Sequence, residues 1–190
     1  MGDLIARLGK GLRGLSALRR LPEVAACRRA TRQWVRLTAG YIGLPIRLPF
    51  EIRLATGPFR FESIADVRTF WPIFFGGIYE VRLSDRVIVD AGANIGAFSL
   101  YALLSAPHAR VIAIEPAPDS CNRVRQTIRD HGLEDRFTLH QAALGGHTGV
   151  TTLNMQAGSQ FRSTGAGGIE VQMLMLDQIV NGAVALEPFR

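Results

Sequence analysis

The segment Val87–Gly96 constrains the fold of this chain more than any other stretch. It reads Val-Ile-Val-Asp-Ala-Gly-Ala-Asn-Ile-Gly, and it opens with an apolar, β-branched run without polar alternation. Such a run is typical of a strand that is buried on both faces in a parallel sheet. Gly92 and Gly96 bracket a short turn, and Ala97–Leu104 then consists of helix-forming residues. This order predicts the first unit of a Rossmann-like α/β sheet, in which ligands bind beyond the carboxyl end of the strand.

The spacing of the glycines distinguishes two kinds of nucleoside ligand. Counted from Gly92, a dinucleotide fingerprint needs glycine at position 94 and glycine or alanine at position 97. The chain has Asn94 and Ala97, so the central glycine that lets a pyrophosphate approach the backbone is missing. A second predicted strand, Ala109–Glu115, ends in an acid roughly 20 residues further on. A carboxylate there can accept both hydroxyls of a ribose, whether the ligand is NAD or S-adenosylmethionine (SAM).

Four stretches of the sequence resemble one family of enzymes. They are Asp-Ala-Gly-Ala-Asn-Ile-Gly at 90–96, Ala-Ile-Glu-Pro at 113–116, Gln-Ala-Ala-Leu-Gly at 141–145 and Met-Leu-Met-Leu-Asp-Gln-Ile-Val at 173–180. The first is similar to motif I of class I SAM methyltransferases. Together the four resemble the FkbM family of SAM-dependent methyltransferases, from about Ile46 to Val180. This resemblance implies methylation of a hydroxyl on a glycan or small molecule, with SAM as the cofactor.

The resemblance also implies which residues bind the cofactor. The candidates are Asp90, Ala91, Gly92, Ala93, Asn94, Gly96, Glu115, Pro116, Gln141 and Ala142. We expect Asp90 to bind the N–H groups of the turn or the SAM ammonium, and Glu115 to bind the ribose. The two glycines would allow close approach of the ligand, and Asn94 would hold the loop. Gln141 and Ala142 follow the third predicted strand, where SAM enzymes contact adenine.

The catalytic group cannot be assigned from the sequence. Methyl transfer from a sulfonium is an in-line displacement, so the main contribution of the enzyme is alignment of the reactants. His140 and Tyr79 are the candidates for a base, although each also suits a packing role. The four histidines are scattered and no cysteine pair has the spacing of metal ligands, so we expect no metal site.

The resemblance implies an incomplete sheet. Class I methyltransferases have the strand order 3-2-1-4-5-7-6, and the FkbM family carries a Lys-Ile-Asp-x-Glu-Gly type motif on the fourth strand. No such motif occurs up to Arg190. We therefore expect three core strands and a β-excursion, in an FkbM domain truncated at its C-terminus and forming a partial SAM-binding half. The alternatives are an inactive SAM-binding fragment or partner subunit, and an NAD-type oxidoreductase, against which Asn94 counts.

A sheet without its fourth strand has consequences for association. The edge of Val87–Val89 would then be uncovered, and exposed apolar edges pair with other chains. We therefore expect self-association through this edge.

Charge is distributed unevenly along the chain. Nine basic and two acidic residues lie in 1–40, whereas 13 basic and 14 acidic residues lie in 41–190. We therefore divide the chain into a basic amphipathic leader, 1–40, and a near-neutral methyltransferase domain, 41–190. A near-neutral domain argues against nucleic acid as a partner. The leader has leucines at three- and four-residue steps, which is typical of a helix on anionic lipid or of one packed on the domain.

The composition also bears on the compartment. No unbroken apolar run reaches about 18 residues, so no membrane span is predicted. Two cysteines are too few for a disulfide framework. We expect a cytoplasmic protein, with peripheral contact to the inner face of the membrane as a further option for the leader.

The region before the motif strand predicts a hairpin followed by a helix. Ile46–Leu54 alternates as a half-buried edge strand, and Phe59–Glu62 can return beside it. Ser63 with Asp66 resembles a capping box, and Trp71-Pro72 is expected to break or kink the helix that follows. An aromatic cluster suits core packing or a lid over the ligand, with Tyr79 the best candidate for the lid. Its members are Phe70, Trp71, Phe74, Phe75 and Tyr79.

The region after the second strand predicts one helix and three strands. The helix runs from Pro118 or Asp119 to His131 and stops at Gly132. The strands are Arg136–Ala143, Val150–Met155 and Ile169–Leu176, with a Gly/Ser-rich loop at Gln156–Gly168. Asp177 is expected to be the N-cap of a final helix.

Overall fold

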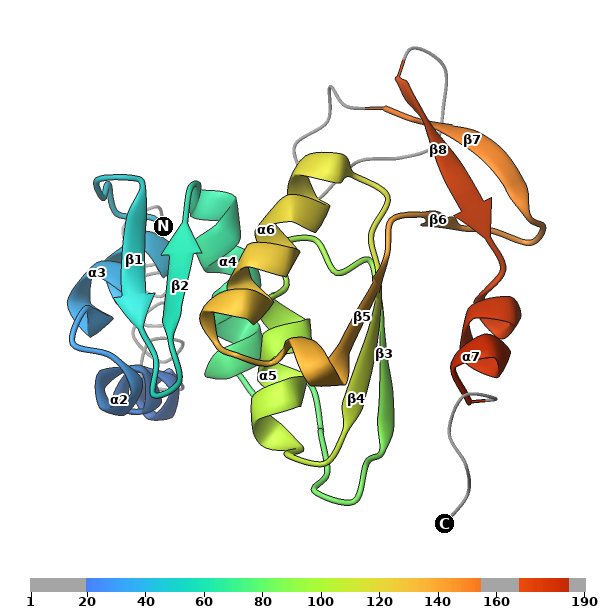
Figure 1. Ribbon diagram of the computed structural model, residues 1–190. Helices are drawn as coiled ribbons and strands as arrows, with labels where there is room; N and C mark the ends of the chain where they lie inside the picture. The colour runs from blue at the N-terminus through green and yellow to red at the C-terminus, as the bar shows by residue number, and fades with distance from the viewer. Residues whose placement is uncertain (1–19, 155–167, 185–190) are drawn as a thin grey trace, which may run out of the picture. The chain divides into compact units, whose positions relative to one another are not determined.

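The computed structural model describes residues 20–154 and 168–184, the last three of them by backbone alone (Figure 1). The chain divides after Ile78 into two compact units. No helix in the described ranges is long and apolar enough to cross a membrane. The predicted boundary after residue 40 stays a prediction, and residues 1–19 of the predicted leader lie outside the described residues.

The first unit combines three helices with a two-stranded antiparallel sheet. The elements are α2 (Leu21–Ala30), α3 (Trp34–Tyr41), β1 (Phe50–Arg53), β2 (Pro58–Phe61) and α4 (Ile64–Phe74). The predicted hairpin is confirmed, but β1 is shorter than the expected strand at Ile46–Leu54. Pro49 explains the late start, because it has no N–H group to donate to a ladder. Helix α4 contacts both of the other described helices of the unit through Trp71. Trp71 Nε1 donates to Glu23 Oε2 of α2 (2.5 Å), and the Trp71 ring stacks on Tyr41 of α3.

Helix α4 begins at the predicted capping box. Ser63 Oγ accepts from the Asp66 N–H (3.2 Å), and Asp66 Oδ2 accepts from the Ser63 N–H (3.2 Å). Of the two outcomes expected at Trp71-Pro72, a break is wrong, because the helix continues through Pro72 to Phe74. Pro72 lies in the last turn, so the missing N–H removes one helical hydrogen bond just before the end. Phe70 and Trp71 are fully buried, which agrees with core packing for this part of the aromatic cluster.

The second unit contains the predicted parallel sheet. Strands β3 (Val87–Ala91), β4 (Arg110–Ile114) and β5 (Phe137–His140) pair in the order β3-β4-β5. This matches the 3-2-1 half of the class I order. Helices α5 (Ala97–Ser105) and α6 (Pro118–Asp130) connect the strands, and the short helix η1 (Glu134–Arg136) precedes β5. This part of the chain is therefore an α/β unit of the Rossmann-like class.

The central strand of this sheet is β4, and the expectation that the motif strand is buried on both faces is wrong. In the described part of the chain β3 lies at the edge, and the side chain of Val87 is 38% exposed. The two faces of β4 contribute to separate cores. Val111 and Ala113 pack with residues of α5 and α6, while Ile112 and Ile114 pack with Ile179.

A second three-stranded sheet follows, with the order β6-β8-β7. It consists of β6 (Ala143–Leu144), β7 (Gly149–Leu153) and β8 (Ile169–Leu174), and α7 (Leu176–Val184) comes after it. The predicted strand at Arg136–Ala143 is thus two elements, because β5 ends at His140 and Ala143 belongs to β6. The predicted Gly/Ser-rich loop lies outside the described residues except for Gly168. Asp177 lies in the first turn of α7, so its prediction as the N-cap is wrong.

Candidate functional site

The turn after β3 departs from ordinary backbone geometry at three positions. The φ angles are +86° at Gly92, +49° at Asn94 and +77° at Gly96. Glycine adopts such angles without a steric cost, and asparagine tolerates them better than most other residues. The N–H groups of Gly92 and Ala93 both donate to the carbonyl of Ile114 (2.8 and 3.0 Å). The turn is therefore fastened to the end of the neighbouring strand β4.

Glu115 joins this turn to the start of α6. Its side chain is 7% exposed, and its Oε2 accepts from the Asn94 N–H (2.8 Å). Its Oε1 accepts from the Ala117 N–H at 3.0 Å. Sequence reasoning missed this role, because the spacing of the acid indicates a ligand contact and not a contact with the turn. Each carboxylate oxygen has a second lone pair, so the hydrogen bonds to the backbone leave acceptor capacity for a ligand.

Asp90 lies at the end of β3 and faces α5. It is 6% exposed, and its Oδ2 accepts a hydrogen bond from the hydroxyl of Ser99 (2.6 Å). Burial raises the pKa of Asp90 above its ordinary value of 3.8, the Ser99 hydrogen bond lowers it, and the nearby Glu115 carboxylate raises it further. Ser99 was not among the predicted site residues. The sequence feature that could have identified Ser99 is a polar residue early in a helix that is mainly apolar.

Asn94 contributes an unpaired acceptor to the turn. Its side-chain Oδ1 is buried and has no hydrogen-bond partner among the described residues. A buried polar atom without a partner costs about 1–3 kcal/mol, so such atoms mark positions where a ligand or a water supplies the missing donor. The turn therefore presents an acceptor for a ligand with N–H or O–H groups.

The two glycines of the turn have different surroundings. A Cβ atom added at Gly92 would meet no atom within 4 Å, whereas one at Gly96 would lie 3.4 Å from the Val124 Cα of α6. Gly92 thus borders open space, as the predicted close approach of a ligand requires. Gly96 is where α6 packs closely against the turn.

The main candidates lie together at the carboxyl ends of the parallel strands. Asp90, Glu115 and Gln141 lie at or directly after the carboxyl ends of β3, β4 and β5. The register pairs Ala91 with Ile114, and Ile114 with His140, so the three strand ends are level. The other candidates lie in the same turns. Ala93 and Ala142 are buried, Pro116 is half-buried, and Ala91 and Gln141 are exposed.

The two candidate bases predicted from the sequence lie within the described part of the chain. His140 is half-buried at the end of β5, and Tyr79 is 46% exposed with its ring 4.5 Å from that of Phe98. Cys121 donates from Sγ to the carbonyl of Glu115 (3.0 Å), and burial raises its pKa to about 11, so it stays a thiol at neutral pH. Within the ranges that the structure covers, no cluster of three His, Cys, Asp or Glu could hold a metal ion.

Comparison with known proteins identifies the class and then the family. The fold is that of a Rossmann-like methyltransferase domain, with its polar groups at the carboxyl ends of parallel strands. The family model for the methyltransferase FkbM domain matches residues 90–187, more than half of the chain. The chain belongs to the FkbM methyltransferase family.

Three similar proteins each align with part of this chain. Methyltransferase 1 of Beauveria bassiana is 36% identical over 75 residues, which are 38% of this chain and 30% of that protein. Methyltransferase sdnD of Sordaria araneosa is 60% identical over 35 residues, which are 18% of this chain and 14% of that protein. The FkbM methyltransferase structure from Methylobacillus flagellatus aligns with a TM-score of 0.39 and 21% identity, over 56% of this chain and 25% of that one. The chain thus spans less than a third of the length of each of these proteins.

Proposed function

We propose that the turn after β3 binds SAM, and that the chain is the SAM-binding part of an enzyme that methylates a hydroxyl of a glycan or small molecule. When bound, SAM would supply a methyl group activated by its sulfonium. The observation that carries the proposal is the buried, unpaired Oδ1 of Asn94, next to the carboxylate that binds its own N–H. SAM carries an ammonium group and two ribose hydroxyls, all of which are donors.

Several residues at the carboxyl ends of the parallel strands would bind the cofactor, each at a different part of the molecule. Glu115 already binds two backbone N–H groups, and the free lone pairs of its carboxylate would accept from the ribose. Gly92 leaves space for the ligand beside the backbone. Asp90 is buried behind Ser99, so we assign it to positioning the start of α5 and the turn, in addition to the predicted interaction with the SAM ammonium. Gln141 and Ala142 would flank the adenine.

A second candidate function is that of a SAM-binding partner subunit without activity of its own. One observation favours it: the described part of the chain leaves one edge of β3 unpaired. An NAD-type oxidoreductase is less well supported, because Asn94 occupies the position at which a pyrophosphate requires glycine.

Calorimetry tests the ligand and the role of Glu115 together. The full chain should bind SAM and its demethylated product S-adenosylhomocysteine, and should bind NAD more weakly. Glu115→Ala should weaken SAM binding by about 1.5–3 kcal/mol, the scale of a hydrogen bond to a charged group. Glu134→Ala, which removes an exposed acid of η1, should leave the affinity unchanged. The proposal fails if NAD binds as well as SAM, or if the two variants behave alike.

A further inference from the structure

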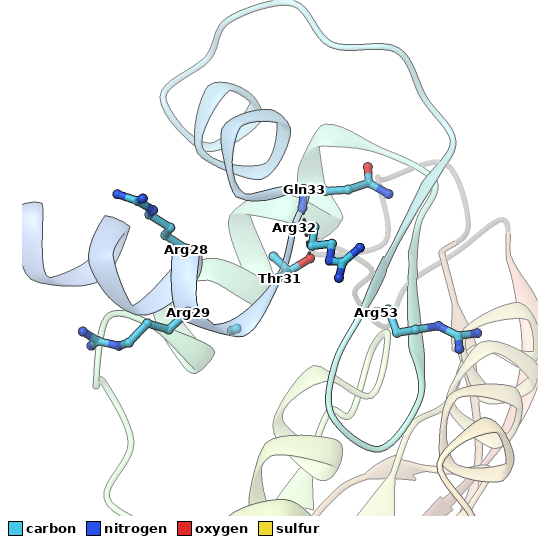
Figure 2. Close-up of a pocket in the computed structure, with 7 residues that line it drawn as sticks. Arg28, Arg29, Thr31, Arg32, Gln33 and Arg53 are labelled. Carbon is cyan, nitrogen blue, oxygen red and sulfur yellow. Dashed lines mark hydrogen bonds between the residues drawn. The ribbon is translucent and has the colours of Figure 1, made fainter.

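The first unit contains a hollow of about 550 Å³ (Figure 2). None of the residues that line it belongs to the candidate SAM site. Its size is within the range of small-ligand sites. Four of the residues that line it are arginines, and the polar residues Thr31 and Gln33 lie between them in the sequence. The arginines are Arg28 and Arg29 of α2, Arg32 after it, and Arg53 of β1.

Hydrogen bonds fix the backbone beneath this hollow. Thr31 is buried at the end of α2, and its Oγ1 accepts from the Gln33 N–H (3.2 Å). The side-chain amide of Gln33 donates to the carbonyl of Glu51 in β1 (2.6 Å). The segment between α2 and α3 is therefore hydrogen-bonded to β1, the strand that carries Arg53. The backbone segments that carry the arginines are thus connected to one another.

The charge in this hollow is uncompensated within the described ranges. No carboxylate lines it, and none of its four arginines forms an ion pair with a described residue. Glu51 shares the exposed face of β1 with Arg53 but is not among the lining residues. In Figure 2 the side chains of Arg32 and Arg53 extend to the right, and those of Arg28 and Arg29 extend to the left. A multiply charged anion would offset the repulsion between these guanidinium groups.

We propose that this hollow binds the phosphate group of a phosphate-bearing ligand, with Arg32 and Arg53 as its main contacts. Guanidinium groups bind phosphate oxygens through two parallel hydrogen bonds, and a phosphate monoester carries a charge of about −2 near neutral pH. Two chemical sources share this group: a soluble phosphate compound and the headgroup of an anionic lipid.

Two binding measurements on the full chain separate these sources. Calorimetry with inorganic pyrophosphate tests the soluble source, and co-sedimentation with phosphatidic acid vesicles tests the lipid source, with phosphatidylcholine vesicles as the blank. The test variant is the pair Arg32→Gln and Arg53→Gln. The matched control is Arg47→Gln with Arg68→Gln, which removes the same charge from exposed positions of the same unit that do not line the hollow.

The wild-type chain should bind at least one of the two probes. The test variant should lose about tenfold or more in affinity, the scale expected when a charged hydrogen-bond partner is removed, while the control stays within about twofold. Circular dichroism of both variants verifies that they are folded. Binding to neither probe would overturn the proposal, and so would equal losses in the two variants, because the attraction would then depend on net charge alone.

Discussion

At the scale of single residues, the candidate site depends on two buried carboxylates with different partners. Glu115 accepts from backbone N–H groups of two segments, and Asp90 accepts from Ser99 of α5. The pKa of Asp90 is raised above its ordinary value of 3.8, and burial is the largest cause. A buried carboxylate favours its protonated form unless hydrogen bonds or opposite charges compensate.

The raised pKa of Asp90 predicts a pH-dependent contribution to stability. Between the unfolded pKa of 3.8 and the raised folded pKa, the folded state binds more protons, so stability falls as pH rises through this window. Asp90→Asn removes that contribution. Urea unfolding from neutral pH to about pH 4 should therefore show the wild-type chain gaining free energy of unfolding relative to the variant on acidification. Asp135→Asn, at an exposed position, serves as the control, and parallel curves for wild type and Asp90→Asn would contradict the prediction.

At the scale of elements, the family resemblance predicted the order of the parallel strands, whereas the apolar pattern alone did not predict which of them is central. Val87–Val89 and Val111–Ile114 are both apolar runs, and hydrophobic periodicity cannot tell a central strand from an edge strand with a similar composition. The register assigns the central place to β4, because it pairs with a strand on each side. Strand β6 has two residues, which is too short to carry a periodic signal.

The candidate site was predictable where the motif determines the backbone. The turn at Gly92–Gly96 and the acid at Glu115 follow from residue type and spacing. The bond from Ser99 to Asp90 was not predictable, because it joins a strand to a helix face across a packed interface. The backbone contacts of Glu115 were hidden for the same reason, since they depend on how the turn folds back over β4.

One edge of β3 has no partner strand among the described residues, which predicts self-association that a single charge would reduce. Val87 is partly exposed on this strand, and a lysine at an edge disfavours pairing with another strand. We expect the wild-type chain to form dimers or larger species at micromolar concentration, and Val87→Lys to shift the population toward monomer in analytical ultracentrifugation. Leu83→Lys, in the exposed segment before β3, makes the same chemical change away from the ladder. A wild-type chain that is monomeric throughout, or two variants that behave alike, would refute this.

At the scale of the whole molecule, basic charge and the family motif belong to different parts of the chain. The excess of basic residues lies in 1–40, whereas the matched family domain begins at residue 90. Helices α2 and α3, which include the second half of that basic segment, pack in the first unit with α4. The predicted contact of residues 1–40 with a membrane surface stays a prediction, and three arginines of the phosphate site proposed above lie in the same segment.

The 190-residue chain is expected to bind SAM without completing methyl transfer. A hydroxyl acceptor must lose its proton, and the two candidate bases are exposed to different degrees, with His140 half-buried and Tyr79 46% exposed. Incubation of the chain with SAM and a panel of glycan and small-molecule hydroxyl acceptors should yield no S-adenosylhomocysteine above a blank without protein. Product formation by a purified, monomeric chain would show that residues assigned here to structure complete an active site.

The parallel sheet has a consequence for the order of folding during synthesis. Its three strands and two connecting helices lie in one unbroken stretch, 87–140, and each strand pairs with the next one along the chain. Each parallel pairing closes a crossover through one α-helix, with Val87 opposite Arg110 and Val111 opposite Phe137, so the sheet needs only residues 87–140 to have been made. As the chain leaves the ribosome, the turn of Asn94 and its bond to Glu115 can thus assemble before the β6-β8-β7 sheet has been made. If SAM binds as proposed, SAM that is present at that moment would bind the nascent chain and stabilise the folded sheet of residues 87–140.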